Sequence, residues 1–233
     1  MNKHFFYSAV LLVILSLALF LFSRYFPAKT VDMTMKDRLT LVLDPGHGGA
    51  DGGANVNDVF ESRLNLDIAR KLDNIMGLFS VPVVLTRNSE DLIYPPGART
   101  IREKKIADQK QRIALINATA NAVLISIHQN KFSDSAPQGA QVFFSGVAGS
   151  EQYALLTQDI LKTVLNPNNR RAARPIDSDI LLMRKTVCPA ILVECGFMSN
   201  PDELRLLQTD TYQTKLAICL AASFFQAQEI LKD

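Results

Sequence analysis

The 233-residue sequence contains no tryptophan, only three cysteines and only three histidines. The cysteines, Cys188, Cys195 and Cys219, are odd in number and lack paired spacing, which excludes a disulfide scaffold and a cysteine-rich zinc site. Cys188 and Cys195 bracket an expected strand. Strand geometry would hold them roughly 23 Å apart, at about 3.3 Å per residue, which is too far for a disulfide.

An excess of charge of one sign is also missing. The chain carries 25 Lys and Arg against 23 Asp and Glu, and beyond residue 35 the two signs balance at 22 each. A domain without net positive charge does not attract a polyanion, so the sequence argues against nucleic-acid binding. With 48% hydrophobic and 21% charged residues, the composition is globular and excludes full-length disorder and fibrous repeats.

Residues 5–22 form an unbroken run of 18 residues without a charge. As a helix this run would span about 27 Å, close to the thickness of a bilayer core. It could be a cleaved signal peptide or an uncleaved anchor. Residues 21–28 read LFSRYFPA and lack a small-residue cleavage pattern, which favours a transmembrane anchor. Basic residues flank both ends, so charge alone does not orient the anchor.

The rest of the chain has the pattern of one α/β domain. We expect an anchor over residues 1–26, a tether over 27–38 and a catalytic body over 39–233. Short apolar runs, expected to be strands, lie at 39–43, 82–85, 122–127, 139–144 and 190–193. Helical periods lie at about 61–79, 102–118, 151–165, 202–207 and 211–231. This alternation predicts a twisted, mainly parallel sheet with helices on both faces.

The body contains only two histidines, His47 and His128, and each follows an apolar strand. A third expected strand ends at Glu194, and Glu61 opens the first helix. Because the carboxyl ends of parallel strands share one edge of a sheet, these side chains could converge there. Two imidazoles and one carboxylate form a catalytic zinc triad, which leaves the other carboxylate as a general base. The alternative is that the histidines are structural.

The glycine-rich segment 45–53 (PGHGGADGG) raises the possibility of a phosphate-binding loop. A dinucleotide fingerprint starting at Gly46 would need glycine where Asp51 stands, and a lysine loop starting at Gly48 would need lysine where Ala54 stands. The glycines therefore better explain a tight backbone turn around His47.

Four segments, LVLDPGHGGADGGA, ESRLNLDIARKL, ISIHQN and PAILVECGFMSNPDE, together resemble the zinc-dependent N-acetylmuramoyl-L-alanine amidases in order and spacing. The resemblance covers about residues 39–231. It implies that His47, Glu61 and His128 hold one zinc ion per chain. It also implies that Glu194 is the catalytic general base and acid.

The resemblance suggests weaker roles for four further residues. Asp44 and Asp51 lie in the first motif and are candidates to support His47 from outside the metal site, although turn hydrogen bonding would equally explain them. Arg184 is a candidate for substrate positioning, with a structural salt bridge as the alternative. Asn130 completes the S-x-H-x-N pattern and is a candidate for substrate positioning as well as for support of its loop.

Two residues depart from the family pattern. Gln129 stands where a small residue is common, and Cys195 stands where an apolar residue is usual, which suits a small buried side chain. No wall-binding repeats flank the domain. A minimal anchored domain with IREKKIADQKQRIALIN before ISIHQN is similar to the sporulation branch, which acts on spore-cortex peptidoglycan on the path to muramic-δ-lactam.

The resemblance implies hydrolysis of the amide joining N-acetylmuramic acid to L-alanine, with peptidoglycan as the substrate. Peptidoglycan lies outside the cytoplasm, so we expect a membrane-anchored body there, with the forespore intermembrane space as one candidate location. Two other classes stay open. One is a catalytically weak peptidoglycan-binding or regulatory protein of the same fold, in which a protein partner controls activity or zinc retention. The other is a zinc peptidase acting on a different amide.

Overall fold

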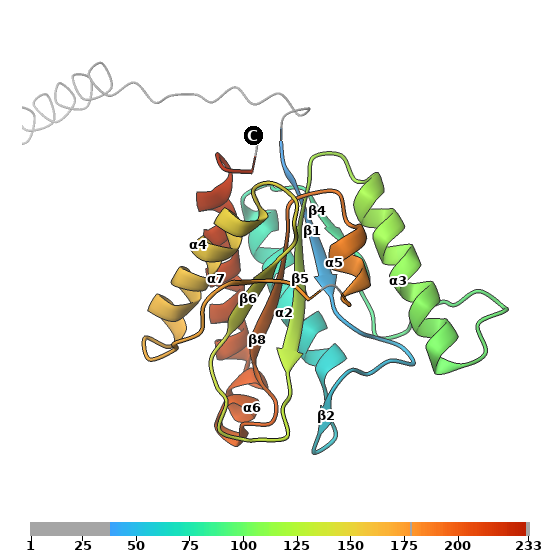
Figure 1. Ribbon diagram of the computed structural model, residues 1–233, viewed down its shortest axis with the longest axis horizontal. Coiled ribbons are helices and arrows are strands. Elements are labelled where there is room, and N and C mark those ends of the chain that lie inside the picture. The colour runs from blue at the N-terminus through green and yellow to red at the C-terminus, as the bar shows by residue number, and fades with distance from the viewer. Residues whose placement is uncertain (1–37, 178, 232–233) are drawn as a thin grey trace, which may run out of the picture. The chain divides into compact units, whose positions relative to one another are not determined.

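A computed structural model describes residues 38–177 and 179–231, in which strands and helices alternate along the chain (Figure 1). The strands are β1 (Thr40–Pro45), β2 (Asn55–Val56), β3 (Val59–Phe60), β4 (Val83–Leu85), β5 (Ala122–Asn130), β6 (Gln141–Phe144), β7 (Arg174–Pro175) and β8 (Ala190–Phe197). The helices are α2 (Glu61–Leu78), α3 (Ile101–Ala118), α4 (Ser150–Leu165), α5 (Leu181–Lys185), α6 (Pro201–Leu207) and α7 (Asp210–Ala227).

The predicted membrane anchor, residues 5–22 within the expected segment 1–26, lies outside the described residues, as does the predicted tether up to residue 37. The expected division into anchor, tether and body therefore stays a prediction. Among the described residues, none of the helices combines the length and the apolar character needed to cross a bilayer.

Six of the strands form one sheet, in the order β4-β1-β5-β8-β6-β7. β1 pairs in parallel with β4 and β5, and β5 pairs in parallel with β8. β6 runs antiparallel to β8, while the short β7 is parallel to β6. The prediction of an α/β domain with a mainly parallel sheet is confirmed, and one reversed strand makes the sheet mixed.

Helices cover both faces of the sheet. The side chains of Leu41 and Leu43 pack into a core with α2, α4 and α7, whereas Val42 between them packs into a smaller core with α3 and α5. All three side chains are fully buried. This two-sided burial explains why the strands read as unbroken apolar runs. Figure 1 shows α4 and α7 on one side of the sheet and α3 and α5 on the other.

The structure differs from the expected boundaries where pairing continues beyond the apolar residues. We expected strands to end at Ile127 and Val193, but β5 and β8 run on because His128 pairs with Glu194 in register. Both predicted site residues therefore lie within strands and not beyond them. The helix α5, the strand β7 and the β2–β3 hairpin were not predicted, because each is too short to show a period.

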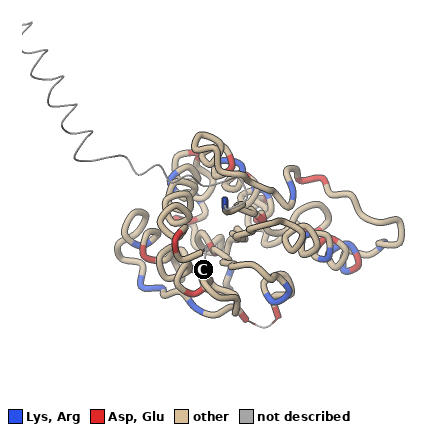
Figure 2. Tube along the Cα trace, turned by 90° about the horizontal axis from the view of Figure 1, so that it is seen from above, with Lys and Arg blue, Asp and Glu red and all other residues tan. Residues whose placement is uncertain are grey.

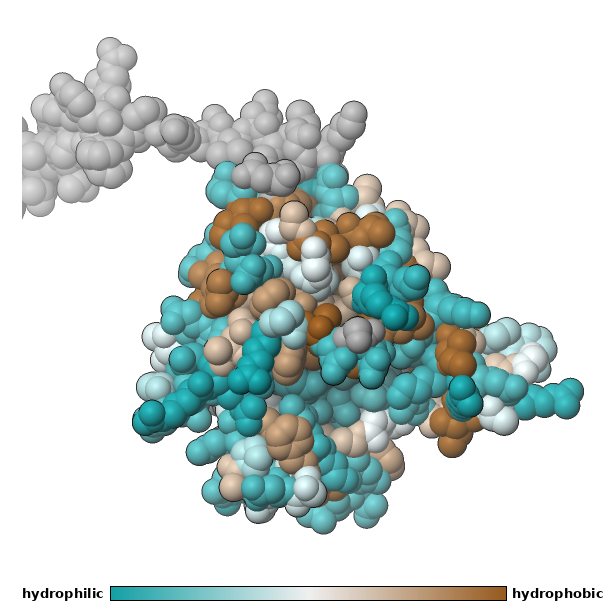
Figure 3. Space-filling view, viewed as in Figure 1, coloured by the Kyte–Doolittle hydropathy of each residue, from teal (hydrophilic) through white to brown (hydrophobic). Residues whose placement is uncertain are grey.

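The surface of the domain mixes charges of both signs. Acidic and basic positions are interspersed along the described trace, as Figure 2 shows. On the face seen in Figure 3, exposed apolar side chains lie in separate patches among hydrophilic ones. Charged residues of both signs also line a cavity at one edge of the sheet, among them Glu61, Lys105 and Arg112.

Candidate active site

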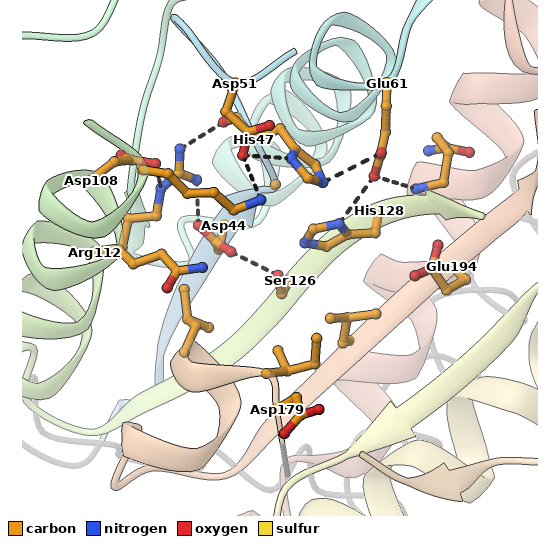
Figure 4. Close-up of a pocket in the computed structure, with 17 residues that line it drawn as sticks. Asp44, His47, Asp51, Glu61, Asp108, Arg112, Ser126, His128, Asp179 and Glu194 are labelled. Atoms are coloured by element: carbon orange, nitrogen blue, oxygen red, sulfur yellow. Dashed lines mark hydrogen bonds and ion pairs between the residues drawn. The ribbon is translucent and has the colours of Figure 1, made fainter. Parts of the chain in front are cut away.

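A cavity of about 420 Å³ opens at the carboxyl ends of β1, β5 and β8. Four side chains predicted from the sequence line it: His47 from the loop after β1, Glu61 from the first residue of α2, His128 from β5 and Glu194 from β8. Figure 4 shows them around one space, with the first three pointing toward one another. The edge expected from parallel-sheet topology is thus where these residues meet.

His47, Glu61 and His128 form a compact group. His47 Nε2 lies 3.4 Å from Glu61 Oε2, and His128 Nδ1 lies 3.1 Å from Glu61 Oε1. One ligand atom from each of the three residues lies within 4.8 Å of the others. The two imidazole rings pack edge to face at 5.1 Å. The carboxylate therefore lies between two nitrogen donors, as in a metal site.

Two glycines make room for this group. A Cβ on Gly46 would lie 2.3 Å from His128 Nε2, and a Cβ on Gly53 would lie 2.6 Å from Glu61 Oε2 and 2.8 Å from His47 Cδ2. Real Cβ atoms do not approach other atoms so closely. The glycine-rich loop after β1 thus allows close approach of the three side chains, whereas the sequence had suggested only a tight turn around His47.

Glu61 is held on both carboxylate oxygens. Oε2 accepts a hydrogen bond from Ala54 N at 2.9 Å, and Oε1 accepts one from Gln129 N at 3.1 Å. Burial alone would raise the pKa of Glu61, but hydrogen bonds and charge from His128 and His47 hold it well below its usual range. Glu61 is therefore a fixed, ionised carboxylate at a helix N-terminus, where negative charge is also favoured.

His47 is in contact with a carboxylate through its other ring nitrogen. Asp51 Oδ2 lies 3.1 Å from His47 Nδ1, and Lys105 Nζ lies 2.9 Å from the same oxygen. Burial disfavours a charged His47, but Asp51 and Glu61 outweigh it and raise the pKa of His47 to about 9. A carboxylate behind a histidine is the usual support of a metal ligand. Asp51 is thus in contact with His47, and its supporting role stays a prediction.

Glu194 differs from Glu61 in its surroundings. Its Oε2 is buried and has no hydrogen-bond partner within the part of the chain that the structure describes. Burial raises the pKa of Glu194 to about 7, with a smaller opposing effect from His128. A carboxyl group that titrates near neutral pH and has a free oxygen suits proton transfer.

The donor set fits a metal ion. Two imidazole nitrogens and one carboxylate oxygen match the catalytic sites of zinc, which use three protein ligands and leave a fourth position open. The cavity provides the open side, and the two close glycines leave the donors unobstructed. The chain can therefore hold a metal ion with His47, Glu61 and His128, next to a separate carboxyl group.

The family model for N-acetylmuramoyl-L-alanine amidases, Amidase_3, matches residues 41–224. The chain belongs to this amidase family. The predicted enzyme class, N-acetylmuramoyl-L-alanine amidase, is thereby confirmed.

Among curated relatives, the germination-specific N-acetylmuramoyl-L-alanine amidase of Bacillus subtilis is 36% identical over 178 residues, which cover 76% of this chain and 74% of that protein. LytC of the same organism is 27% identical, but the match covers only 33% of the length of LytC. Among solved structures, the CwlD amidase of Clostridioides difficile, determined in complex with the GerS lipoprotein, matches with a TM-score of 0.79 at 34% identity. That match covers 83% of this chain and 100% of that one.

In this amidase, Asp44 does not contact the imidazole of His47. Its carboxylate accepts hydrogen bonds from Arg112 Nη1 at 2.7 Å, Thr86 Oγ1 at 2.6 Å and Ser126 Oγ at 2.7 Å. Burial opposes ionisation, but Arg112 and these hydrogen bonds bring the pKa of Asp44 down to about 2. Asp44 therefore reaches the turn that carries His47 through Arg112, and its supporting role stays a prediction.

Arg184 and Asn130 do not line the cavity. Arg184 lies on α5 with an exposed side chain, and Asn130 lies at the end of β5, where its carbonyl oxygen accepts Met198 N at 2.7 Å. Their roles in the amidase stay predictions. Cys195 is fully buried and burial raises its pKa, which agrees with a small core residue. All three cysteines are free and buried, which includes the burial predicted for Cys195.

The structure explains one departure from the family pattern. The Gln129 side chain is buried, and its Nε2 donates to Asn65 Oδ1 at 3.1 Å, which links β5 to α2 beside the metal site. Asn65 Nδ2 in turn donates to Gly46 O at 3.1 Å. The larger side chain therefore joins β5 to α2 through its amide nitrogen.

Proposed function

We propose that this amidase hydrolyses the bond between N-acetylmuramic acid and L-alanine in peptidoglycan, at one zinc ion held by His47, Glu61 and His128. In this proposal Glu194 accepts and returns the proton. The observation that carries the proposal is the convergence of three donors within 4.8 Å beside a separate carboxyl group, in a cavity of a family member.

The carboxylates of Glu61 and Glu194 have different roles in this proposal. Both oxygens of Glu61 are engaged, by backbone N–H groups and by the two histidines, which supports its role as a ligand. Glu194 has a free buried oxygen and lies on a rigid strand next to His128, which supports its role as the proton acceptor. When bound, zinc would supply polarisation of the scissile carbonyl and a lowered pKa for water.

Glu194 would then carry out the proton transfer. Its pKa near 7 allows it to take a proton at neutral pH and to return it to the departing alanine nitrogen. His47 keeps its orientation through Asp51, so only one ring nitrogen faces the cavity. The scissile C–N bond breaks, one water is consumed, and the glycan keeps a carboxylic acid while the stem peptide leaves with a free amino terminus.

The biological setting is a further part of the proposal. The likeness to a germination-specific amidase supports action on spore-cortex peptidoglycan, on the path to muramic-δ-lactam. Such a substrate places the domain outside the cytoplasm, held by a membrane anchor at residues 5–22. The CwlD amidase was solved with a lipoprotein partner, which supports control of activity or zinc retention by a protein partner here too.

The deciding experiment is mass spectrometry of purified peptidoglycan after incubation with the zinc-loaded full-length protein. We expect stem peptides with a free L-alanine amino terminus and glycan stripped of peptide, with Glu194→Gln as the inactive control. Cleavage within the stem peptide would instead identify a zinc peptidase. Binding without any cleavage would favour the binding-protein alternative.

A further inference from the structure

The turn that carries His47 has a constrained backbone. His47 has a φ of 62°, in the left-handed region that favours glycine, and the following Gly48 and Gly49 have φ values of 128° and 57°. A non-glycine residue in this conformation persists only where its surroundings hold it in place. The groups that hold this turn therefore decide where the His47 imidazole points.

Two buried arginines bind three successive carbonyl oxygens of this turn. Arg87 Nε donates to Pro45 O at 2.8 Å, and its Nη2 donates to Gly46 O at 3.1 Å. Arg112 Nη1 donates to the same Pro45 O at 2.8 Å, and its Nη2 donates to His47 O at 2.7 Å. The guanidinium groups come from distant parts of the chain and meet on one short stretch of backbone.

Arg87 also joins the turn to the helix that carries the carboxylate ligand. The same Nη2 donates to Ser62 O at 2.7 Å, one residue after Glu61. The approach is close, because a Cβ on Gly48 would lie 2.9 Å from Arg87 Nε. Only 5% of Arg87 is exposed, so water does not compete for these hydrogen bonds. Arg87 thus fixes the separation of two ligand-bearing segments.

Arg112 is anchored from its other side. Its Nη1 lies 2.7 Å from Asp44 Oδ1, its Nε lies 2.9 Å from Asp108 Oδ2, and only 4% of the residue is exposed. Two carboxylates therefore hold the guanidinium in one orientation, with its remaining donors aimed at the turn. This also gives Asp44 a contact chain to His47, which its own side chain does not touch.

We propose that Arg87 and Arg112 are positioning residues of the metal site. Together they hold the backbone from Pro45 to His47 so that the imidazole faces Glu61. Each arginine uses several donors of a planar fork at once, and a lysine ammonium cannot reproduce that arrangement. The proposal rests on the metal site of the proposed function, but it concerns metal affinity and not hydrolysis.

The test uses the full-length protein with Arg87→Lys or Arg112→Lys. Each substitution keeps the positive charge and removes the planar set of guanidinium donors. Zinc dissociation constants are measured by competition with a chelator, and thermal unfolding is followed on the metal-free protein. We expect each variant to be folded without metal and to bind zinc at least about tenfold more weakly, as for other residues that orient ligands. The absorption spectrum of the Co²⁺-loaded variants should also change shape.

Arg171→Lys is the matched control. Arg171 Nε also donates to a loop carbonyl, Gln138 O at 2.9 Å, but it lies outside the cavity lining. The control should keep the parent zinc affinity even if its melting temperature falls. A similar fall in melting temperature in the Arg87 and Arg112 variants, with parental zinc affinity, would overturn the proposal, because their role would then be structural.

The outcomes separate this proposal from the proposed function. If the parent binds no zinc, both fail together. If the parent binds zinc but cleaves no amide, the proposed function fails, and the zinc affinities of the variants still decide the role of the arginines. Should Arg112→Lys not fold, Arg87→Lys gives the answer, since it leaves the carboxylate partners of Arg112 in place.

Discussion

Replacing Glu194 and Glu61 separately by glutamine should separate the base from the ligand. Glu194→Gln keeps the size of the side chain and removes the proton acceptor. We expect zinc content to be unchanged and hydrolysis to fall at least about 100-fold, equivalent to about 2.7 kcal/mol of barrier at 1.36 kcal/mol per tenfold. Glu61→Gln should instead weaken zinc binding, because one of three ligands loses its charge, and added zinc should partly restore activity.

The burial of Glu194 gives this prediction a second, independent readout. Its pKa rises to about 7 from 4.5 in the protein without metal, so folding disfavours the charged form. Ionisation of Glu194 therefore lowers the free energy of unfolding progressively as pH rises above about 4.5. The loss reaches at most about 3 kcal/mol once pH passes 7. Metal-free Glu194→Gln should therefore unfold at higher urea than the parent at pH 8, and the difference should vanish near pH 4.

Three measurements decide between the two roles: zinc content, the rate of stem-peptide release, and urea unfolding of the metal-free protein. If Glu194→Gln loses zinc while Glu61→Gln retains it, the roles are reversed. If neither change affects hydrolysis, the proposed mechanism is wrong for this chain. A metal-free Glu194→Gln protein that is less stable than the parent at pH 8 would refute the argument from burial.

Four further predictions follow from the site and the sequence. His47→Ala and His128→Ala should each abolish the single zinc per chain, and metal analysis showing full zinc in both would refute the site. Gly46→Ala should also weaken zinc binding, since its Cβ would lie 2.2 Å from His128 Cε1, and an unchanged zinc affinity would contradict the packing. The lowering of the Asp44 pKa from 3.8 to about 2 is worth about 2 kcal/mol of stability, fully present above about pH 4 and lost as pH falls toward 2. Urea unfolding from pH 7 to 2 should show this loss in the parent and less of it in Asp44→Asn. Residues 5–22 should remain on the mature protein, and N-terminal sequencing that begins near residue 28, with the protein free in the wash, would reverse that expectation.

The convergence of the candidate ligands could be predicted because it follows from topology. His47, His128 and Glu194 each follow an apolar run of a parallel strand, and such strands end at one edge. Glu61 was recognisable as the first residue of a helix that starts near the same edge. The resemblance to a known family then assigned each residue a role.

The two arginines could not be predicted in the same way. Arg112 lies in a helix rich in charged residues, where a periodic pattern gives no reason to single it out. Its partner Asp44 is 68 residues away in the sequence, so their ion pair appears only once the chain is folded. Arg184 was selected on resemblance alone; it is exposed on α5 outside the cavity lining, and its role in substrate positioning stays a prediction.

The strand β1 connects two opposite edges of the described sheet. The described chain enters at Arg38, beside the amino end of β1, and the cavity opens beyond the carboxyl end of the same strand. Six residues at about 3.3 Å each separate the two ends by about 20 Å. Arg38 itself therefore lies at the edge of the sheet opposite the cavity. The described chain from Arg38 into β1 thus does not pass the mouth of the cavity, which is the side on which the proposed peptidoglycan substrate would enter.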